Sequence, residues 1–248
     1  MILGELNIKQ NYDWLRDFHG CDGGDIGSPE KPSVWVCGIE WGGGHTVENL
    51  RQIAAEPYTG DTEFGYGDWQ ECVAYPYNIS VCKLLCALNG GQVENYRRFA
   101  EEVQPFVHKA DSGYFKMNLY PIAFKNTDAS LWQQEFSEIT GFADKQEYVN
   151  FCNKYRFAQM NQWAEQYRPR LIIGFGTSYD KEFNVAFSDG LSGFRQEEIV
   201  GKKLKWKRNQ NDTLLAVLPF PSGSHGLNSN ESLQKFGERL AELLVGRE

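Results

Sequence analysis

The stretch Val34-Trp-Val-Cys-Gly-Ile-Glu-Trp-Gly-Gly-Gly44 decides the fold. Residues 34–39 are apolar and rich in β-branched or aromatic side chains, which is typical of a strand buried on both faces in a parallel sheet. The run ends on Glu40, and Trp41 and three glycines follow. Ligands of open α/β sheets bind outside the carboxyl ends of the strands, and glycine lets the backbone turn sharply there. Glu40 therefore stands where a reacting group is expected, although a solvated glutamate in a tight turn fits the same residues.

Three more apolar runs, at residues 114–118, 171–176 and 214–218, predict three further strands. Helical patterns are predicted at residues 11–18, 45–55, 79–88, 94–107, 130–139, 145–167, 179–187 and from Asn228 or Asn230 onward. Residues 194–208 predict a hairpin. This alternation predicts an α/β three-layer sandwich, with a central, mostly parallel four-stranded sheet flanked by helices and a small hairpin before the last strand. We expect one domain over residues 1–248.

Composition narrows the classes of function. The net charge of −8 argues against broad polyanion binding but permits a local basic patch. The N-terminus lacks the pattern of a signal peptide, and no apolar stretch reaches the length of about 18 residues that a membrane span needs. The six cysteines form no C-x-x-C pair and are expected to be reduced and buried. We expect a cytoplasmic monomer without cofactor, metal or membrane contact.

Polar residues follow three of the predicted strands. Glu40 ends the first strand, Asn118 ends the second, and the loop after the fourth carries His225. If the strands are parallel, these groups meet at one edge of the sheet. Glu can act as a general base toward water, worth about 10²–10⁴-fold in rate, and an Asn amide can read the edge of a heterocycle. With an aromatic segment at residues 64–77 for stacking, this set is expected of an enzyme that holds an extruded base.

From Ser33 to the C-terminus, the chain resembles the uracil-DNA glycosylase superfamily in the order of its motifs. The segment Gly38-Ile-Glu-Trp-Gly42 is similar to its GINPG-like motif, Met117-Asn-Leu-Tyr-Pro121 to its N-x-x-P motif, and the loop at residues 220–228 to its HPS-type loop. The resemblance implies a DNA base-excision glycosylase, closest in motif style to the single-strand-selective and mismatch-acting branches. Such an enzyme holds a flipped uracil-type base and cleaves its N-glycosidic bond.

The resemblance also implies roles for individual residues. Glu40 would orient the attacking water and His225 would assist catalysis. Asn118 would bind the uracil edge. The substrate-binding set would comprise Gly38, Ile39, Trp41, Gly42, Phe64, Tyr77, Asn118, Tyr120, Phe220 and Ser222. Contacts to the DNA backbone would come from Ser224, Asn228, Lys203 and Lys205. The lysines share one face with Lys207, and such a face is more often found on an edge strand that is guarded against aggregation.

Two other functions fit the sequence. Phe220 stands where the HPS-type motif has histidine, and phenylalanine cannot donate a hydrogen bond to a departing base. The chain could therefore be a catalytically inactive module that binds a nucleobase, a nucleotide or a protein partner. A third hypothesis is an unrelated α/β hydrolase with Ser222 and His225 as a nucleophilic pair. Those two residues lie in one short loop without an obvious third member.

Overall fold

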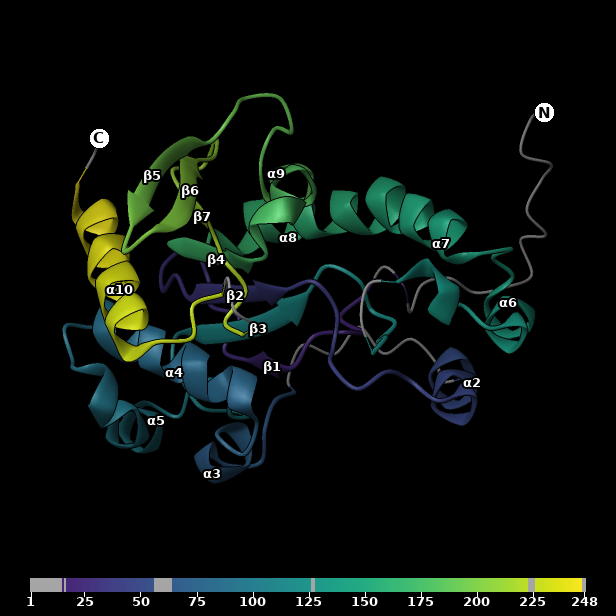
Figure 1. Ribbon diagram of the computed structural model, residues 1–248, viewed down its shortest axis with the longest axis horizontal. Helices are drawn as coiled ribbons and strands as arrows, with labels where there is room; N and C mark the ends of the chain where they lie inside the picture. The colour runs from purple at the N-terminus through teal and green to yellow at the C-terminus, as the bar shows by residue number, and fades with distance from the viewer. Residues whose placement is uncertain (1–14, 16, 56–63, 126–127, 223–225, 247–248) are drawn as a thin grey trace.

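The computed structural model of the protein describes residues 15, 17–55, 64–125, 128–222 and 226–246. Its sheet has seven strands in the order β1-β3-β2-β4-β7-β6-β5, which follow one another from the bottom to the top of Figure 1. The strands are β1 Gly23–Gly24, β2 Val34–Gly38, β3 Tyr114–Asn118, β4 Leu171–Phe175, β5 Arg195–Ile199, β6 Lys202–Arg208 and β7 Leu214–Leu218. The α-helices are α2 Val47–Ala55, α3 Trp69–Cys72, α4 Pro76–Leu88, α5 Tyr96–Val103, α6 Gln134–Thr140, α7 Lys145–Phe151, α8 Phe157–Tyr167, α9 Asp180–Phe187 and α10 Asn230–Val245.

The α/β class and the parallel core are confirmed. Strands β3, β2, β4 and β7 are the four predicted runs, and they pair in parallel. The sheet is larger than the predicted four strands, because β6 pairs antiparallel with β7, β5 with β6, and β1 with β3. The hairpin joins the sheet because Leu204 and Trp206, alternating along β6, are buried in the same core as β7. Strand β1 was not predicted because it is two glycines long and has no side-chain pattern.

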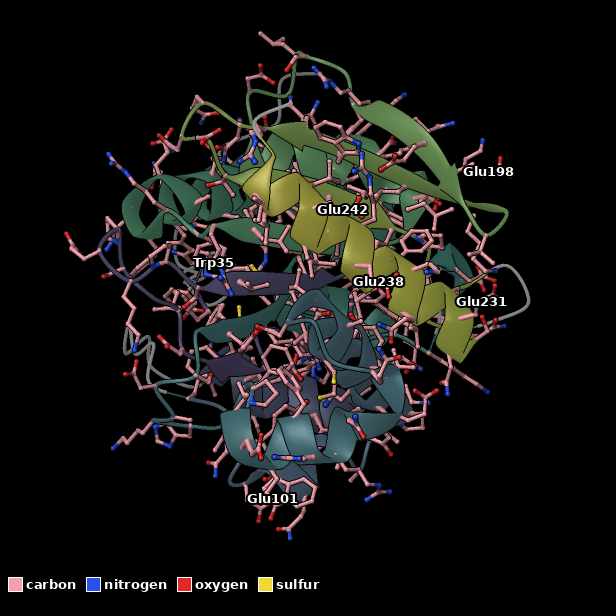
Figure 2. All side chains as sticks on the ribbon, turned by 90° about the vertical axis from the view of Figure 1, so that its left-hand side faces the viewer. Trp35, Glu101, Glu198, Glu231, Glu238 and Glu242 are labelled. Atoms are coloured by element: carbon pink, nitrogen blue, oxygen red, sulfur yellow. The ribbon has the colours of Figure 1, made fainter. Side chains whose placement is uncertain are left out.

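Helices cover both faces of the sheet. Val34 and Val36 of β2 enter one core, while Trp35 and Cys37 enter the other, because successive strand residues point to opposite faces. The first core packs against α4, α5 and α10, and the second against α8 and α9 (Figure 1). Figure 2 shows Trp35 in the interior beside β2. Each buried aliphatic or aromatic side chain stabilises the fold by about 1.5–3 kcal/mol.

The long helix predicted at residues 145–167 forms as α7 and α8, joined by a π turn, η3, at Cys152–Arg156. Asp144 caps its start by accepting a hydrogen bond from the main-chain N–H of Glu147 at 2.8 Å. Of the helix predicted at residues 11–18, most lies outside the described residues. Among the residues that the structure describes, no helix is long and apolar enough to cross a membrane.

Arg156, at the end of the π turn, ties the segment before β1 to the end of β3. Its side chain is fully buried. The guanidinium donates five hydrogen bonds of 2.8–3.2 Å to main-chain carbonyl oxygens, those of Leu15, Asp17, His19, Asn118 and Leu119. Arginine has five N–H donors, so this arrangement uses its whole donor capacity. The clamp fixes the backbone on which Asn118 stands.

The order of the parallel strands creates a crevice at the carboxyl edge. From β2 the chain crosses to β3 on one side, and its next parallel strand, β4, lies on the other side of β2. The loops after β2 and β4 consequently leave in different directions. In open α/β sheets, ligands bind at such a switch point, outside the carboxyl ends of the strands. Glu40 lies two residues beyond the end of β2 and is therefore at this point.

Candidate active site

Two cavities open at the carboxyl edge of the sheet. Cavity one, about 540 Å³, is bounded by the ends of β2 and β3, the start of α4 and the residues after β7, and it includes Asn118, Tyr77 and Phe220. Cavity two, about 590 Å³, lies between the residues after β2 and β4 and the side of α7, and it includes Lys145. Glu40 lines both cavities. Both volumes suit a small organic ligand.

Glu40 is a buried carboxyl group with one oxygen that lacks a partner. Its side chain is only 8 % exposed, and Oε2 lies 3.8 Å from the Nζ atom of Lys145. Oε1 has no hydrogen-bond partner among the described residues. Burial raises the pKa of Glu40 from 4.5 to about 7, although the nearby Lys145 ammonium acts to lower it. A carboxyl group that titrates near neutral pH is well suited to general-base catalysis, because ionised and protonated forms are both populated.

Asn118 is held in one orientation at the end of β3. Its Nδ2 donates to the carbonyl oxygen of Gly20 at 2.8 Å and lies 3.4 Å from Oδ2 of Asp22. Its Oδ1 packs over the α-carbon of Gly38, where any side chain would collide with it. Gly38 is therefore required for close packing of the amide. The amide nitrogen faces the protein, and the oxygen is the group that remains for a ligand.

Asp22 organises the floor of cavity one. Its carboxylate accepts hydrogen bonds from the Tyr66 hydroxyl at 2.7 Å, the Lys116 ammonium at 2.8 Å and the Trp41 indole N–H at 3.0 Å. Lys116 and Asp22 are both nearly inaccessible to solvent, so the pair is a buried ion pair whose remaining polar groups are hydrogen-bonded. This network places a positive charge at the cavity wall.

Aromatic rings also line cavity one. The ring of Tyr77 lies 5.5 Å from that of Phe220, and the ammonium of Lys116 lies 5.1 Å from the centre of the Tyr77 ring. The Tyr77 hydroxyl is buried and has no hydrogen-bond partner among the described residues, and burial raises its pKa well above 10. A buried polar group without a partner is costly, so this hydroxyl lowers the stability of the fold.

His45 follows the three glycines and also lines cavity one. Its Nδ1 accepts a hydrogen bond from the main-chain N–H of Ala123 at 3.0 Å. Burial and the neighbouring His19 lower the pKa of His45. The ring is consequently neutral near pH 7, with its proton on Nε2, so that it can donate one hydrogen bond.

The structure brings together part of the predicted site. Cavity one is lined by Gly38, Glu40, Trp41, Gly42, Tyr77, Asn118 and Phe220. Ile39 and Tyr120 line cavity two instead. Phe64 lies away from both cavities, in an aromatic group with Phe18 and Phe115 at 6.0 Å from each, because its ring fills the core beneath β3. Ser222 and Asn228 lie on the surface after β7. His225 and Ser224 lie outside the described residues.

The predicted lysine face of β6 packs toward α9. Lys205 forms an ion pair of 2.6 Å with Asp180, and Lys207 is buried and bonded to Asn184 and Asp189 at 3.0 Å. Lys203 is exposed. The charge of this face is therefore partly neutralised by acidic groups on and after α9. Period-two alternation located the face correctly but could not identify the partners that cover it.

Sequence reasoning did not single out several residues that line cavity one, among them the ionisable residues Asp22, His45 and Lys116. Lys116 carried a usable signal, because a lysine within the apolar run at 114–118 requires a buried counter-charge. His45 also carried one, since it follows the glycines directly. Asp22 carried none, because it lies in a Gly-rich loop and reaches the site only through the pairing of β1 with β3.

Fold and site together define a doubly wound α/β protein with two cavities at the carboxyl edge of its sheet. The chain matches no protein-family model and no curated protein sequence. The resemblance to the uracil-DNA glycosylase superfamily therefore stays a prediction from motifs. Within the described part of the chain, no three His, Cys, Asp or Glu side chains are grouped as a metal ion would require.

Proposed function

We propose that the protein hydrolyses N-glycosidic bonds and holds a planar nucleobase in cavity one. The observation that carries the proposal is the Glu40 carboxyl group, which is buried at the cavity wall, titrates near neutral pH and has an oxygen without a partner. A purely structural glutamate in such surroundings would be expected to have both oxygens hydrogen-bonded.

The chemistry assigns one role to each group. The ionised Glu40 takes a proton from a water molecule, whose oxygen forms a bond to the sugar carbon while the bond from that carbon to the base nitrogen breaks. The electron pair leaves with the base, which afterwards takes up a proton. The Lys116 ammonium and the Nε2–H of His45 can stabilise the negative charge that develops on the base. Asn118 Oδ1 can accept a hydrogen bond from its edge, and Tyr77 and Phe220 offer apolar surface to its ring.

A uracil-type base in DNA is the substrate that the motif resemblance implies. Figure 2 shows Glu231, Glu238 and Glu242 along α10. Glu238 and Glu242 form ion pairs with Lys235 and Arg239, so the negative charge of this helix is partly neutralised. Contact with DNA, if the polymer is the substrate, is expected at the rim of cavity one near Phe220 and Ser222.

Base release tests the proposal. Single- and double-stranded oligonucleotides that carry uracil, hypoxanthine, xanthine or a thymine mismatch are incubated with wild-type protein and with Glu40→Gln, and free base is quantified. We expect release by the wild type and a loss of about 10²–10⁴-fold in Glu40→Gln. Glu135→Gln, an exposed position on α6, is the matched control. Equal release by wild type and Glu40→Gln would refute the assigned role of Glu40.

One observation favours a second candidate, a module that binds a base without cleaving it. Phe220 lines cavity one where the HPS-type motif has histidine, and it cannot stabilise a departing base through a hydrogen bond. This candidate predicts saturable binding of a free base, lost in Asn118→Ala, without release of base from any substrate. Equilibrium binding and release measured on the same preparation separate the two functions.

A further inference from the structure

Cavity two is lined by polar side chains that have no role in binding the base in cavity one. It lies at the switch point of the sheet, between the residues after β2 and those after β4. The side chain of Glu40, more than nine-tenths buried, forms the boundary shared with cavity one. Its unpartnered Oε1 can accept a hydrogen bond from a ligand.

The lining of cavity two is chemically mixed. The Tyr120 hydroxyl lies 3.2 Å from Oδ1 of Asn153, so when it donates to that oxygen the Asn153 amide nitrogen is the group able to donate to a ligand. Ser178 and Glu182 add a hydroxyl and a carboxylate after β4. Such a set of donors and acceptors matches hydroxyl groups, which both donate and accept.

Charge narrows the ligand class. Glu40 and Glu182 contribute carboxyl groups, and among the described lining residues Lys145 is the only cation. Lys145 is already engaged, 3.8 Å from Glu40 and 3.9 Å from the centre of the Phe124 ring. An anion such as a phosphate would meet two carboxyl groups for one occupied ammonium. A neutral polyhydroxyl compound meets no such penalty.

We infer that cavity two is a sugar subsite, which holds the pentose of the nucleoside whose base occupies cavity one. The inference rests on the proposed function and deepens it. The glycosidic bond joins base and sugar, and Glu40 is the described residue with an ionisable side chain that lines both cavities. A nucleoside that spans them therefore places its scissile bond beside this carboxyl group. Asn153 is then a sugar-binding residue.

Binding to Glu40→Gln, in which turnover is expected to be slow, tests the inference. Deoxyuridine, uridine and uracil are titrated by calorimetry. We expect the nucleosides to bind about tenfold more tightly than uracil, which corresponds to one or two net hydrogen bonds. Adding Asn153→Leu should remove the advantage of the nucleosides and leave uracil binding unchanged. Asn150→Leu, an exposed asparagine on α7, is the matched control.

The outcomes separate the two proposals. If uracil binds and the sugar adds nothing, or Asn153→Leu weakens uracil and nucleosides equally, the sugar subsite is refuted and cavity one stands. If neither uracil nor any nucleoside binds, the proposed function fails together with it. Turnover of nucleosides and of oligonucleotides by wild-type protein and by Asn153→Leu then shows whether the sugar comes from a free nucleoside or from a strand.

Discussion

Replacing Glu40 by glutamine should stabilise the fold in a manner that depends on pH. Because the folded-state pKa of Glu40 is about 7 and the ordinary value is 4.5, the folded protein binds more protons than the unfolded chain between these values. Wild-type stability therefore falls as pH rises through this window, and the loss is complete above pH 7. The shift of 7 − 4.5 = 2.5 corresponds to a loss of at most about 3.4 kcal/mol. Glutamine, which is not ionised, avoids this loss.

Urea unfolding followed by tryptophan fluorescence measures the effect, because Trp35, Trp163 and Trp206 are buried in the core. At about pH 8.5, Glu40→Gln should be more stable than wild type by about 2–3 kcal/mol, whereas at about pH 5 the difference should shrink to less than about 1 kcal/mol. Glu135→Gln, exposed on α6, should show no comparable pH dependence. A difference between Glu40→Gln and wild type that is the same at both pH values would refute the assignment of a desolvated carboxyl group.

Three further substitutions test other parts of the site. Tyr77→Phe removes a buried hydroxyl without a partner but keeps the ring, so urea unfolding should show a gain of about 1–2 kcal/mol while titration shows unchanged base binding. Phe220→His introduces a donor into cavity one and should raise base release by up to about 10²-fold; unchanged release would argue against the glycosylase proposal. Arg156→Leu leaves five buried carbonyl oxygens without their donor, at about 1–3 kcal/mol each, and should abolish folding. Arg156→Lys, with fewer donors, should fold with reduced stability in the same unfolding assay.

The fold could be predicted where side chains repeat with a regular period. The runs at 34–38, 114–118, 171–175 and 214–218 are fully buried strands, and a strand buried on both faces favours a mostly apolar sequence, from which Lys116 and Asn118 depart. Strand β1 could not be predicted, because two glycines have no alternation of apolar and polar side chains. The π turn could not be predicted either, because the insertion of one residue hardly disturbs helical spacing over a long segment.

Only those site residues that lie at or just after the ends of predicted strands could be placed from the sequence. Glu40 comes after β2 and Asn118 ends β3, and these two strands are parallel neighbours. The strand assignment therefore predicted that both residues lie at the same edge of the sheet. It did not predict the direction in which each side chain points. Tyr120 lies two residues beyond Asn118 yet lines the other cavity, and Phe64 turned inward among aromatic rings. Local sequence cannot specify such choices, because they depend on which distant element fills the remaining space.

The Arg156 clamp has a consequence for the order in which the protein is made. Leu15 and Arg156 are joined by a hydrogen bond across 141 positions of the chain. At a synthesis rate of about 5–20 residues per second, the beginning of the chain waits roughly 7–28 s before its guanidinium anchor is translated. Until then the carbonyl groups of Leu15, Asp17 and His19 have no donor from this arginine. The hydrogen bonds that fix the backbone at Asn118 are therefore expected to form late during translation, after β2 and β3 have already been synthesised.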